Sequence, residues 1–140
     1  MLKYLLILYL LHILTVCIHE SFHFLAAVLL KLRVKGIYIG FDLLRVRIIK
    51  KLYISPIVLG GYTELDLGQL MVLSKIKTIC VFFSGIAGNF LLILISLMFK
   101  ENIYMTMLLY LNLLCVIQNM IPWFSKVNDA SLYLNILKSK

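Results

Sequence analysis

Two histidines and a glutamate near the start of the chain have a spacing that suits metal-dependent hydrolysis. His19, Glu20 and His23 form the pattern His-Glu-x-x-His within "VCIHESFHFLAAVLL". On a helix, residues four apart project from one face, so both imidazoles can reach one cation. Glu20 is rotated by about 100° from His19, which places its carboxylate beside a metal-bound water. Zinc binds imidazole and carboxylate ligands and lowers the pKa of bound water to about 7. We therefore predict a zinc site with Glu20 as general base.

These three residues lie in a segment that is otherwise apolar enough to cross a bilayer. An ionisable side chain in the middle of a membrane costs about 2.5–3.5 kcal/mol or more, and such residues are rarely kept without a function. The structural alternative is a hydrogen-bonded polar cluster that holds helices together. The cost of burying three ionisable groups favours a functional site over that alternative.

The composition indicates a membrane protein. Of the 140 residues, 63% are hydrophobic and 14% are charged, and the mean hydropathy is +1.03. A soluble domain is nearer half apolar and a quarter charged. The formal net charge is +8, but the lysines and arginines flank apolar runs, so we interpret them as topology signals and lipid-headgroup contacts. We expect a lipid bilayer as a partner and no nucleic acid.

The elements that must position the site can be predicted from the apolar pattern. A spanning helix needs about 20 apolar residues, and residues 2–30, 71–99 and 103–121 qualify. Residues 32–66 are rich in valine, isoleucine and tyrosine and are interrupted by glycine, which predicts a small membrane-associated sheet. Within it we expect a hairpin over residues 32–49 with its turn near 40–43.

The fold class predicted is therefore a polytopic α-helical membrane protein. It has three transmembrane helices, a β-sheet or hairpin between the first and second, and a short C-terminal helix near residues 129–137. Its length argues for one unit, so residues 1–140 are expected to form a single membrane-embedded core.

The positive charges predict the orientation, because cytoplasmic loops carry an excess of lysine and arginine. Residues 31–51 contain seven of them, and Lys75, Lys77, Lys126, Lys138 and Lys140 lie on the same side. The other side has only Lys3 and Lys100. We expect the N-terminus outside, and the basic loop and C-terminus in the cytoplasm of a bacterial-type cell. The histidines would lie in the cytoplasmic half of the membrane.

Two histidines do not complete a zinc site, so a third ligand must come from elsewhere in the chain. Asp42 lies in the expected hairpin turn and Glu101 on the opposite side of the membrane, so we interpret both as solvated. Glu64 and Asp66 follow a Gly-Gly turn just before the second span and could approach the histidines. Asp129, on the expected C-terminal helix, could do so too.

Four stretches of the sequence, in this order, resemble the site-2 protease family of intramembrane zinc metalloproteases. They are "HESFH" (19–23), "LGGYTEL" (59–65), "SGIAGNF" (84–90) and "NMIPWFSKVNDA" (119–130). The last is similar to the family's Asn-x-x-Pro…Asp-Gly motif, with two departures. Ala130 stands where the family has glycine, and the spacing from Pro122 to Asp129 is about two residues longer.

The resemblance implies one Zn²⁺ per chain, bound by His19, His23 and Asp129, with Glu20 as general base and later proton donor. Asn89 would be a polar residue near the site that positions substrate or assists the oxyanion, unless it only forms an interhelical hydrogen bond. Gly60, Gly61 and Tyr62 would offer a strand edge to an extended substrate.

The implied function is hydrolysis of a peptide bond in or near a transmembrane or signal-like segment of a membrane-embedded substrate. Control would come from a separate regulatory membrane partner or from the substrate's own size. Two other classes remain open. One is an inactive relative that binds hydrophobic peptides as a regulator, escort or immunity factor. The other is a metal transporter, which would need a polar path on both sides of the site.

Overall fold

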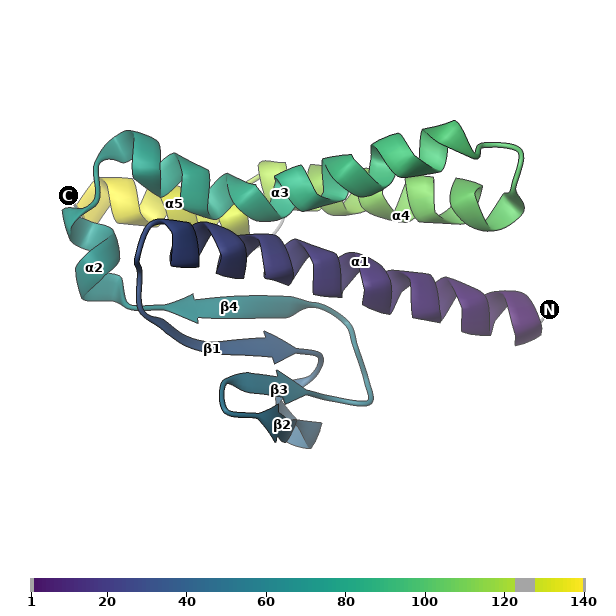
Figure 1. Cartoon of the computed structure of the whole chain (residues 1–140), viewed down its shortest axis with the longest axis horizontal. Helices are drawn as coiled ribbons and strands as arrows, with labels where there is room; N and C mark the ends of the chain where they lie inside the picture. Colours follow the sequence, from purple (N-terminus) through teal and green to yellow (C-terminus); the bar gives the residue numbers. More distant parts are fainter. Residues whose placement is uncertain (1, 123–127, 140) are drawn as a thin grey trace.

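The computed structural model describes residues 2–122 and 128–139, so Lys126 and Lys140 lie outside the described residues. Figure 1 shows three long helices side by side, with a small sheet lying along one side of the first. The elements are α1 (Leu2–Leu29), β1 (Val34–Ile39), a 3-10 turn η1 (Asp42–Leu44), β2 (Val46–Ile49), β3 (Leu52–Ile54), β4 (Gly61–Leu65), α2 (Leu67–Val72), α3 (Lys75–Met98), α4 (Ile103–Met120) and α5 (Asp129–Ser139).

Helices α1, α3 and α4 are long and apolar enough to cross a membrane. The first and third match the predicted spans to within a residue, but the second begins later than predicted. Ser74 starts α3, because its backbone is extended and its side chain accepts a hydrogen bond from the Lys77 N–H. The residues before it form the separate short helix α2, which Asp66 caps in the same way.

The sheet has four strands in the order β2-β3-β1-β4. The hairpin predicted between β1 and β2 is wrong: β1 pairs in parallel with β3 and antiparallel with β4, and β2 pairs with β3. The residues of β2 are all exposed, whereas β3 contributes Leu52 and Ile54 to the apolar cluster against α1. Burial of these two side chains therefore places β3, and not β2, beside β1.

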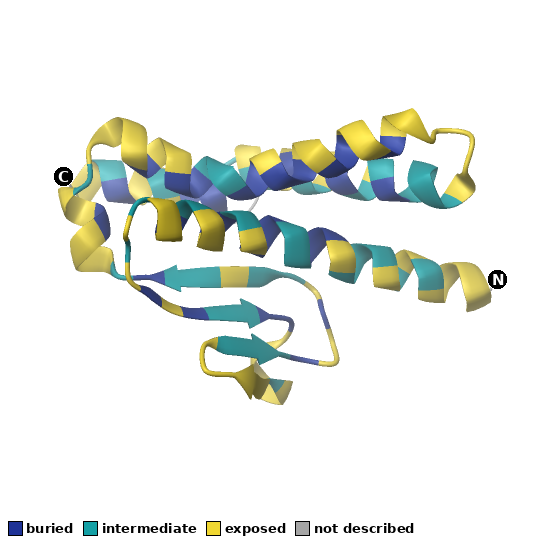
Figure 2. Ribbon diagram, in the orientation of Figure 1, coloured by how far each residue is buried: buried dark blue, intermediate teal, exposed yellow. Residues whose placement is uncertain are grey.

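The buried residues follow the sides of the helices that face one another (Figure 2). Helix α3 approaches α1 closely at two glycines. A Cβ added to Gly88 would lie 2.9 Å from the ring of Phe22, and one added to Gly85 would lie within 2.6 Å of both site imidazoles. Small residues thus let the two helices come together at the level of the histidines.

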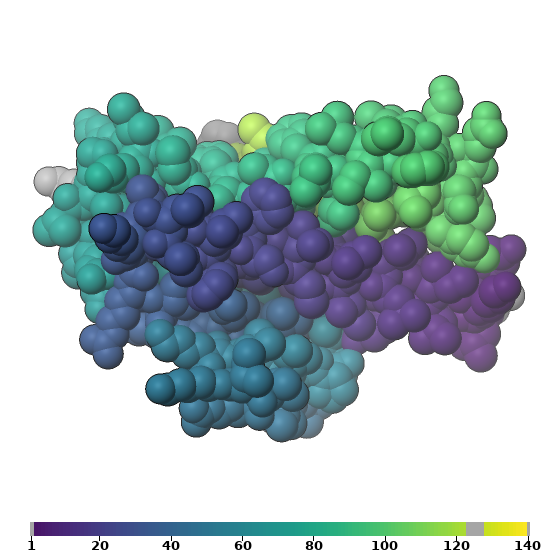
Figure 3. Space-filling model, in the orientation of Figure 1, coloured from purple at the N-terminus to yellow at the C-terminus, as the bar shows by residue number. Residues whose placement is uncertain are grey.

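The sheet packs against α1 and projects from the helical layer (Figure 3). Its inner face contributes Ile39 to a cluster with Val16 of α1 and Val58 of the β3–β4 connection. The Tyr9 hydroxyl holds that connection, since it donates to the Pro56 carbonyl and accepts from the Val58 N–H, both at 2.8 Å. Strand β4, which lies next to α1, is thereby fixed against the helix that carries His19 and Glu20.

The two ends of the molecule are formed by different segments of the chain. One end of the molecule contains the start of α1 and the connection between α3 and α4 (Figure 1). The other end contains α2 and α5, and the sheet lies between the middle of the molecule and this end. This separation agrees with the grouping of positive charges in the sequence. The orientation of the chain in a membrane stays a prediction.

Candidate metal centre

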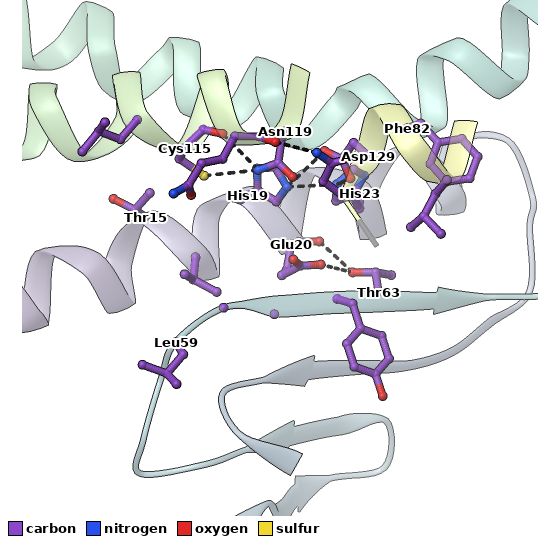
Figure 4. Close-up of a pocket in the computed structure, with 18 of the residues that line it drawn as sticks. Thr15, His19, Glu20, His23, Leu59, Thr63, Phe82, Cys115, Asn119 and Asp129 are labelled. Atoms are coloured by element: carbon purple, nitrogen blue, oxygen red, sulfur yellow. Dashed lines mark hydrogen bonds and ion pairs between the residues drawn. The ribbon is translucent and has the colours of Figure 1, made fainter. Parts of the chain in front are cut away.

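Three potential metal ligands come together at the centre of the helical layer. His19 and His23 are one turn apart on α1, and Asp129 is the first residue of α5. One ligand atom from each lies within 4.8 Å of the others, and all three residues are buried. The two Nε2 atoms are 3.2 Å apart, and Asp129 carboxylate oxygens lie 3.3 Å from that of His19 and 3.2 Å from that of His23. Figure 4 shows the group between α1 and α5.

Hydrogen bonds determine which nitrogen of each imidazole carries the hydrogen and which one could bind a metal ion. His23 Nδ1 lies 2.9 Å from the Val81 carbonyl oxygen, and His19 Nδ1 lies 3.3 Å from Asn89 Oδ1. Both oxygens can only accept, so both Nδ1 atoms carry the hydrogen. In the neutral imidazole each Nε2 then has a lone pair that points into the group. Metal-binding histidines are held in this way by their second nitrogen.

The atoms that converge here fit a zinc ion. Two neutral imidazoles and a carboxylate at this separation bring three electron pairs together, an arrangement that a metal ion among them would stabilise. Asp129 Oδ2 is buried and receives no hydrogen bond from the described residues. Zinc bonds of about 2.0–2.1 Å place neighbouring tetrahedral ligands about 3.3 Å apart, close to the separations found. Imidazole and carboxylate are also the donors that zinc prefers.

Glu20 is buried next to this group, and its side chain points from α1 toward strand β4 (Figure 4). The Thr63 hydroxyl on β4 donates to Glu20 Oε2 at 2.8 Å. Gly61, two residues earlier on the same face of β4, makes room for the side chain: a Cβ there would lie 3.0 Å from Glu20 Cγ. The sheet thus holds Glu20 Oε2, and Oε1 takes no part in the hydrogen bond to Thr63.

The acidic residues left open as third ligands have other roles. Glu64 lies 3.7 Å from the Lys35 ammonium on the sheet, and the Asp66 carboxylate caps α2. Asp42, interpreted as solvated, pairs with Arg45. Within the described residues, only Asp129 joins the two histidines.

The other predicted site residues fall into two groups. Gly60, Gly61 and Tyr62 line a cavity of about 560 Å³ together with the metal-binding group and Glu20. Asn89 is fully buried, contacts His19 from behind, and is not among the residues that line this cavity. Its position suits orientation of an imidazole better than contact with a substrate.

Three further residues shape the site and were not singled out from the sequence as site residues. Gly85 gives the imidazoles space, Thr63 holds Glu20, and Asn128 fixes the start of α5. The glycine could have been found from the small-residue run "SGIAG", since such runs mark close helix contacts. Nothing in the sequence marks Thr63 or Asn128, because their partners are far away along the chain.

Asn128 joins the end of α4 to the start of α5. Its Nδ2 donates to the carbonyls of Gln118 and Ile121 at 2.6 and 2.7 Å, and its Oδ1 accepts from the Ser131 N–H at 2.9 Å. These bonds place the neighbouring Asp129 against α1, in spite of the longer spacing from Pro122.

We expect Asn128→Ala to weaken zinc binding by about 10- to 100-fold, the usual loss when a residue that supports a ligand is removed. Competition with a zinc-selective chelator measures this on the purified protein. Asn135→Ala, an exposed change on the same helix, is the matched control and should leave the affinity unchanged. Equal affinities in both variants would contradict the role of Asn128.

A helix with His-Glu-x-x-His, packed against apolar helices and a small sheet and completed by an aspartate, indicates a membrane metallopeptidase as the class of protein. The sequence model of Peptidase family M50 matches residues 6–103, and the chain therefore belongs to this family, the site-2 proteases. Searches among curated proteins and among solved structures found no match. Since the family match ends before α5, the place of Asp129 in the site rests on the geometry.

Proposed function

We propose that the chain is an intramembrane zinc metalloprotease that hydrolyses a peptide bond in or near a transmembrane or signal-like segment. The observation that carries this proposal is the convergence of His19, His23 and Asp129 beside Glu20, in a cavity that a strand edge lines. Membership of the M50 family supports a metallopeptidase at the level of the family, which also includes inactive relatives.

The residues divide the chemistry among themselves. A zinc ion held by His19, His23 and Asp129 would polarise the scissile carbonyl and acidify a bound water. Glu20 would accept the proton of that water as its oxygen bonds to the carbonyl carbon. Glu20 would then pass the proton to the nitrogen of the scissile peptide bond as the C–N bond breaks. The products are a carboxyl group and an amine. Thr63 would keep the carboxylate turned toward the cavity during both transfers.

Strand β4 offers the substrate a place to bind as an extended chain. Among the residues that the structure describes, it is the last strand of the sheet and pairs with β1 along one edge. Gly60 accepts a hydrogen bond from the Gly40 N–H, and Tyr62 lies opposite Tyr38. Because the bonding direction alternates along a strand, the N–H and C=O groups of Gly61 and Thr63 face the free edge.

This edge meets a requirement of the reaction. A transmembrane helix has its amides in internal hydrogen bonds, so it must unwind locally before a carbonyl carbon can be attacked. If the substrate segment added to the edge of β4 as a strand, hydrogen bonds to β4 would replace its lost helical bonds and hold it in an extended conformation. The substrate class proposed is thus a membrane-embedded peptide or protein, with access controlled by a separate membrane partner or by substrate size.

The orientation proposed for the chain places its N-terminus outside and the site in the cytoplasmic half of the membrane. We expect a phosphatase reporter that works only outside the cytoplasm to be active when inserted after Lys100 and inactive when fused after Lys138. The positive charges around the sheet are the physical reason. Activity of the Lys138 fusion alone would overturn this orientation.

The alternative is an inactive relative that binds hydrophobic peptides as a regulator, escort or immunity factor. The observation in its favour is that the family match ends before Asp129 and that Ala130 follows this residue. The two functions are separated by assaying the purified chain for one bound zinc and for cleavage of membrane peptides. Bound peptide without cleavage by the zinc-loaded chain would favour the alternative.

A further inference from the structure

Three tyrosines form a stack across the sheet. Tyr53 of β3, Tyr38 of β1 and Tyr62 of β4 lie directly opposite one another in the strand register. Their ring centroids are 4.8 and 4.7 Å apart, with interplanar angles of 9° and 22°. This separation equals the distance between neighbouring strands, about 4.7–4.9 Å. The stack ends at Tyr62, because β4 is the edge strand.

The ring of Tyr62 is held in place on two sides. Tyr38 stacks on one face, and Arg45 Nη1 donates to the Tyr62 hydroxyl at 3.1 Å. Arg45 is itself fixed by two hydrogen bonds to the Gly40 carbonyl. Its guanidinium carbon lies 4.9 Å from the Tyr62 centroid and 5.1 Å from that of Tyr38. Since these distances are nearly equal, Arg45 lies beside the stack and does not cover its end.

The Tyr62 side chain lies on the face of the sheet turned away from α1, because its neighbours Gly61 and Thr63 face Glu20. Tyr62 is 44% exposed and lines the same cavity as His19, Glu20 and Asp129. The molecule therefore has an aromatic ring of fixed orientation at the edge where a substrate strand would add.

The strand geometry decides which substrate residue would meet this ring. The N–H and C=O groups of Tyr62 face β1, so an antiparallel strand on the free edge would form a non-hydrogen-bonded pair with it. In such pairs the Cα atoms are about 4.5 Å apart, and the side chains come closest. One substrate side chain, on the same face of the sheet, would continue the stack.

We propose that Tyr62 determines specificity by stacking on an aromatic side chain at the one substrate position that pairs with it. This inference rests on the proposed protease function and on strand addition to β4. Stacked aromatic pairs contribute beyond their buried area, which corresponds to a preference of about 3- to 10-fold over an aliphatic side chain.

A positional scan tests the inference. The full zinc-loaded chain is reconstituted in phosphatidylcholine vesicles with synthetic transmembrane peptides that carry phenylalanine or leucine at successive positions around the cleaved bond. Mass spectrometry gives the kcat/KM ratio of the phenylalanine to the leucine peptide at each position. We expect a ratio of about 3–10 at one position and about 1 at the others.

The variants identify the ring responsible. The ratio should fall to about 1 in Tyr62→Ala and persist in Tyr62→Phe, which keeps the ring and loses only the hydroxyl. Tyr53→Ala removes the ring at the other end of the stack and should retain the ratio. A ratio that survives in Tyr62→Ala, or no preferred position in the unmodified chain, would overturn the inference.

Failure of the inference can be told from failure of the proposed function. Cleavage without an aromatic preference contradicts only the role of Tyr62. If the zinc-loaded chain cleaves no peptide, the protease proposal fails, and binding of fluorescently labelled versions of these peptides to Glu20→Gln still tests the stack. Equal binding of phenylalanine and leucine peptides at every position would then contradict it.

Discussion

Replacing Glu20 with glutamine is expected to abolish peptide-bond hydrolysis while zinc stays bound. The glutamine amide oxygen can still accept the hydrogen bond from Thr63, and the side chain keeps its volume beside Gly61. It cannot accept a proton from water, and general acid–base catalysis contributes about 10²- to 10⁴-fold to such reactions. We therefore expect a loss of at least about 100-fold in kcat with close to one zinc per chain.

The measurement combines metal analysis of the purified variant with cleavage of a co-reconstituted membrane peptide. Glu64→Gln is the matched control, because Glu64 is on the same sheet but pairs with Lys35 at the surface. It should retain full activity. Cleavage by Glu20→Gln at the rate of the unmodified chain would show that the base is another group.

Replacing Gly85 with alanine is expected to remove the metal site, although no ligand residue is itself replaced. The added Cβ would lie 2.4 Å from His23 Nε2 and 2.6 Å from the nearest ring atoms of His19. Atoms separated by less than about 3.0 Å must move, and the imidazoles are anchored by Val81 and Asn89. We expect zinc affinity to fall by more than about 100-fold, beyond the usual effect of losing a supporting residue.

Gly88→Ala on the same helix separates this effect from a general loss of packing. The atoms nearest to its added Cβ would be those of the Phe22 ring and the Ile18 carbonyl, whereas for Gly85 they are atoms of the site imidazoles. We expect Gly88→Ala to lower the unfolding temperature and to keep one zinc per folded chain. Zinc content and thermal unfolding are measured on both variants, and equal zinc content in the two would contradict the role of Gly85.

The parts of the fold that depend on local pattern were predictable. Long apolar runs gave two helices to within a residue, and the approximate place of the sheet and of α5 followed from composition and turn signals. Pairing between strands was not predictable, because β1 and β2 are neighbours in sequence while β3 has the apolar residues that α1 buries. The break before α3 was missed because Met71, Val72 and Leu73 are as apolar as the span that follows, so the short interruption at Ser74, Lys75 and Lys77 was included in one predicted helix.

The same distinction holds for the site. The spacing of His19 and His23 follows from helix geometry alone, so the sequence was sufficient to place them on one face. The residues themselves left Glu64, Asp66 and Asp129 open as partners, since closeness across more than a hundred positions is a property of the tertiary fold. The structure brings Asp129 to the histidines. Their action as zinc ligands, and that of Glu20 as base, stay predictions.

The distance along the chain between the histidines and Asp129 determines when, during synthesis, the proposed metal site could first be complete. Synthesis at about 5–20 residues per second leaves roughly 5–20 s between the appearance of the histidines and that of Asp129. During this interval a nascent chain has two of the three ligands, and its hold on zinc is correspondingly weak. Strand β4 and the cavity wall from α3 are already made, but the cluster closes only with α5. If the chain is the proposed protease, completion of its metal site is thus coupled to translation, and we expect a growing chain to be inactive until α5 has been made.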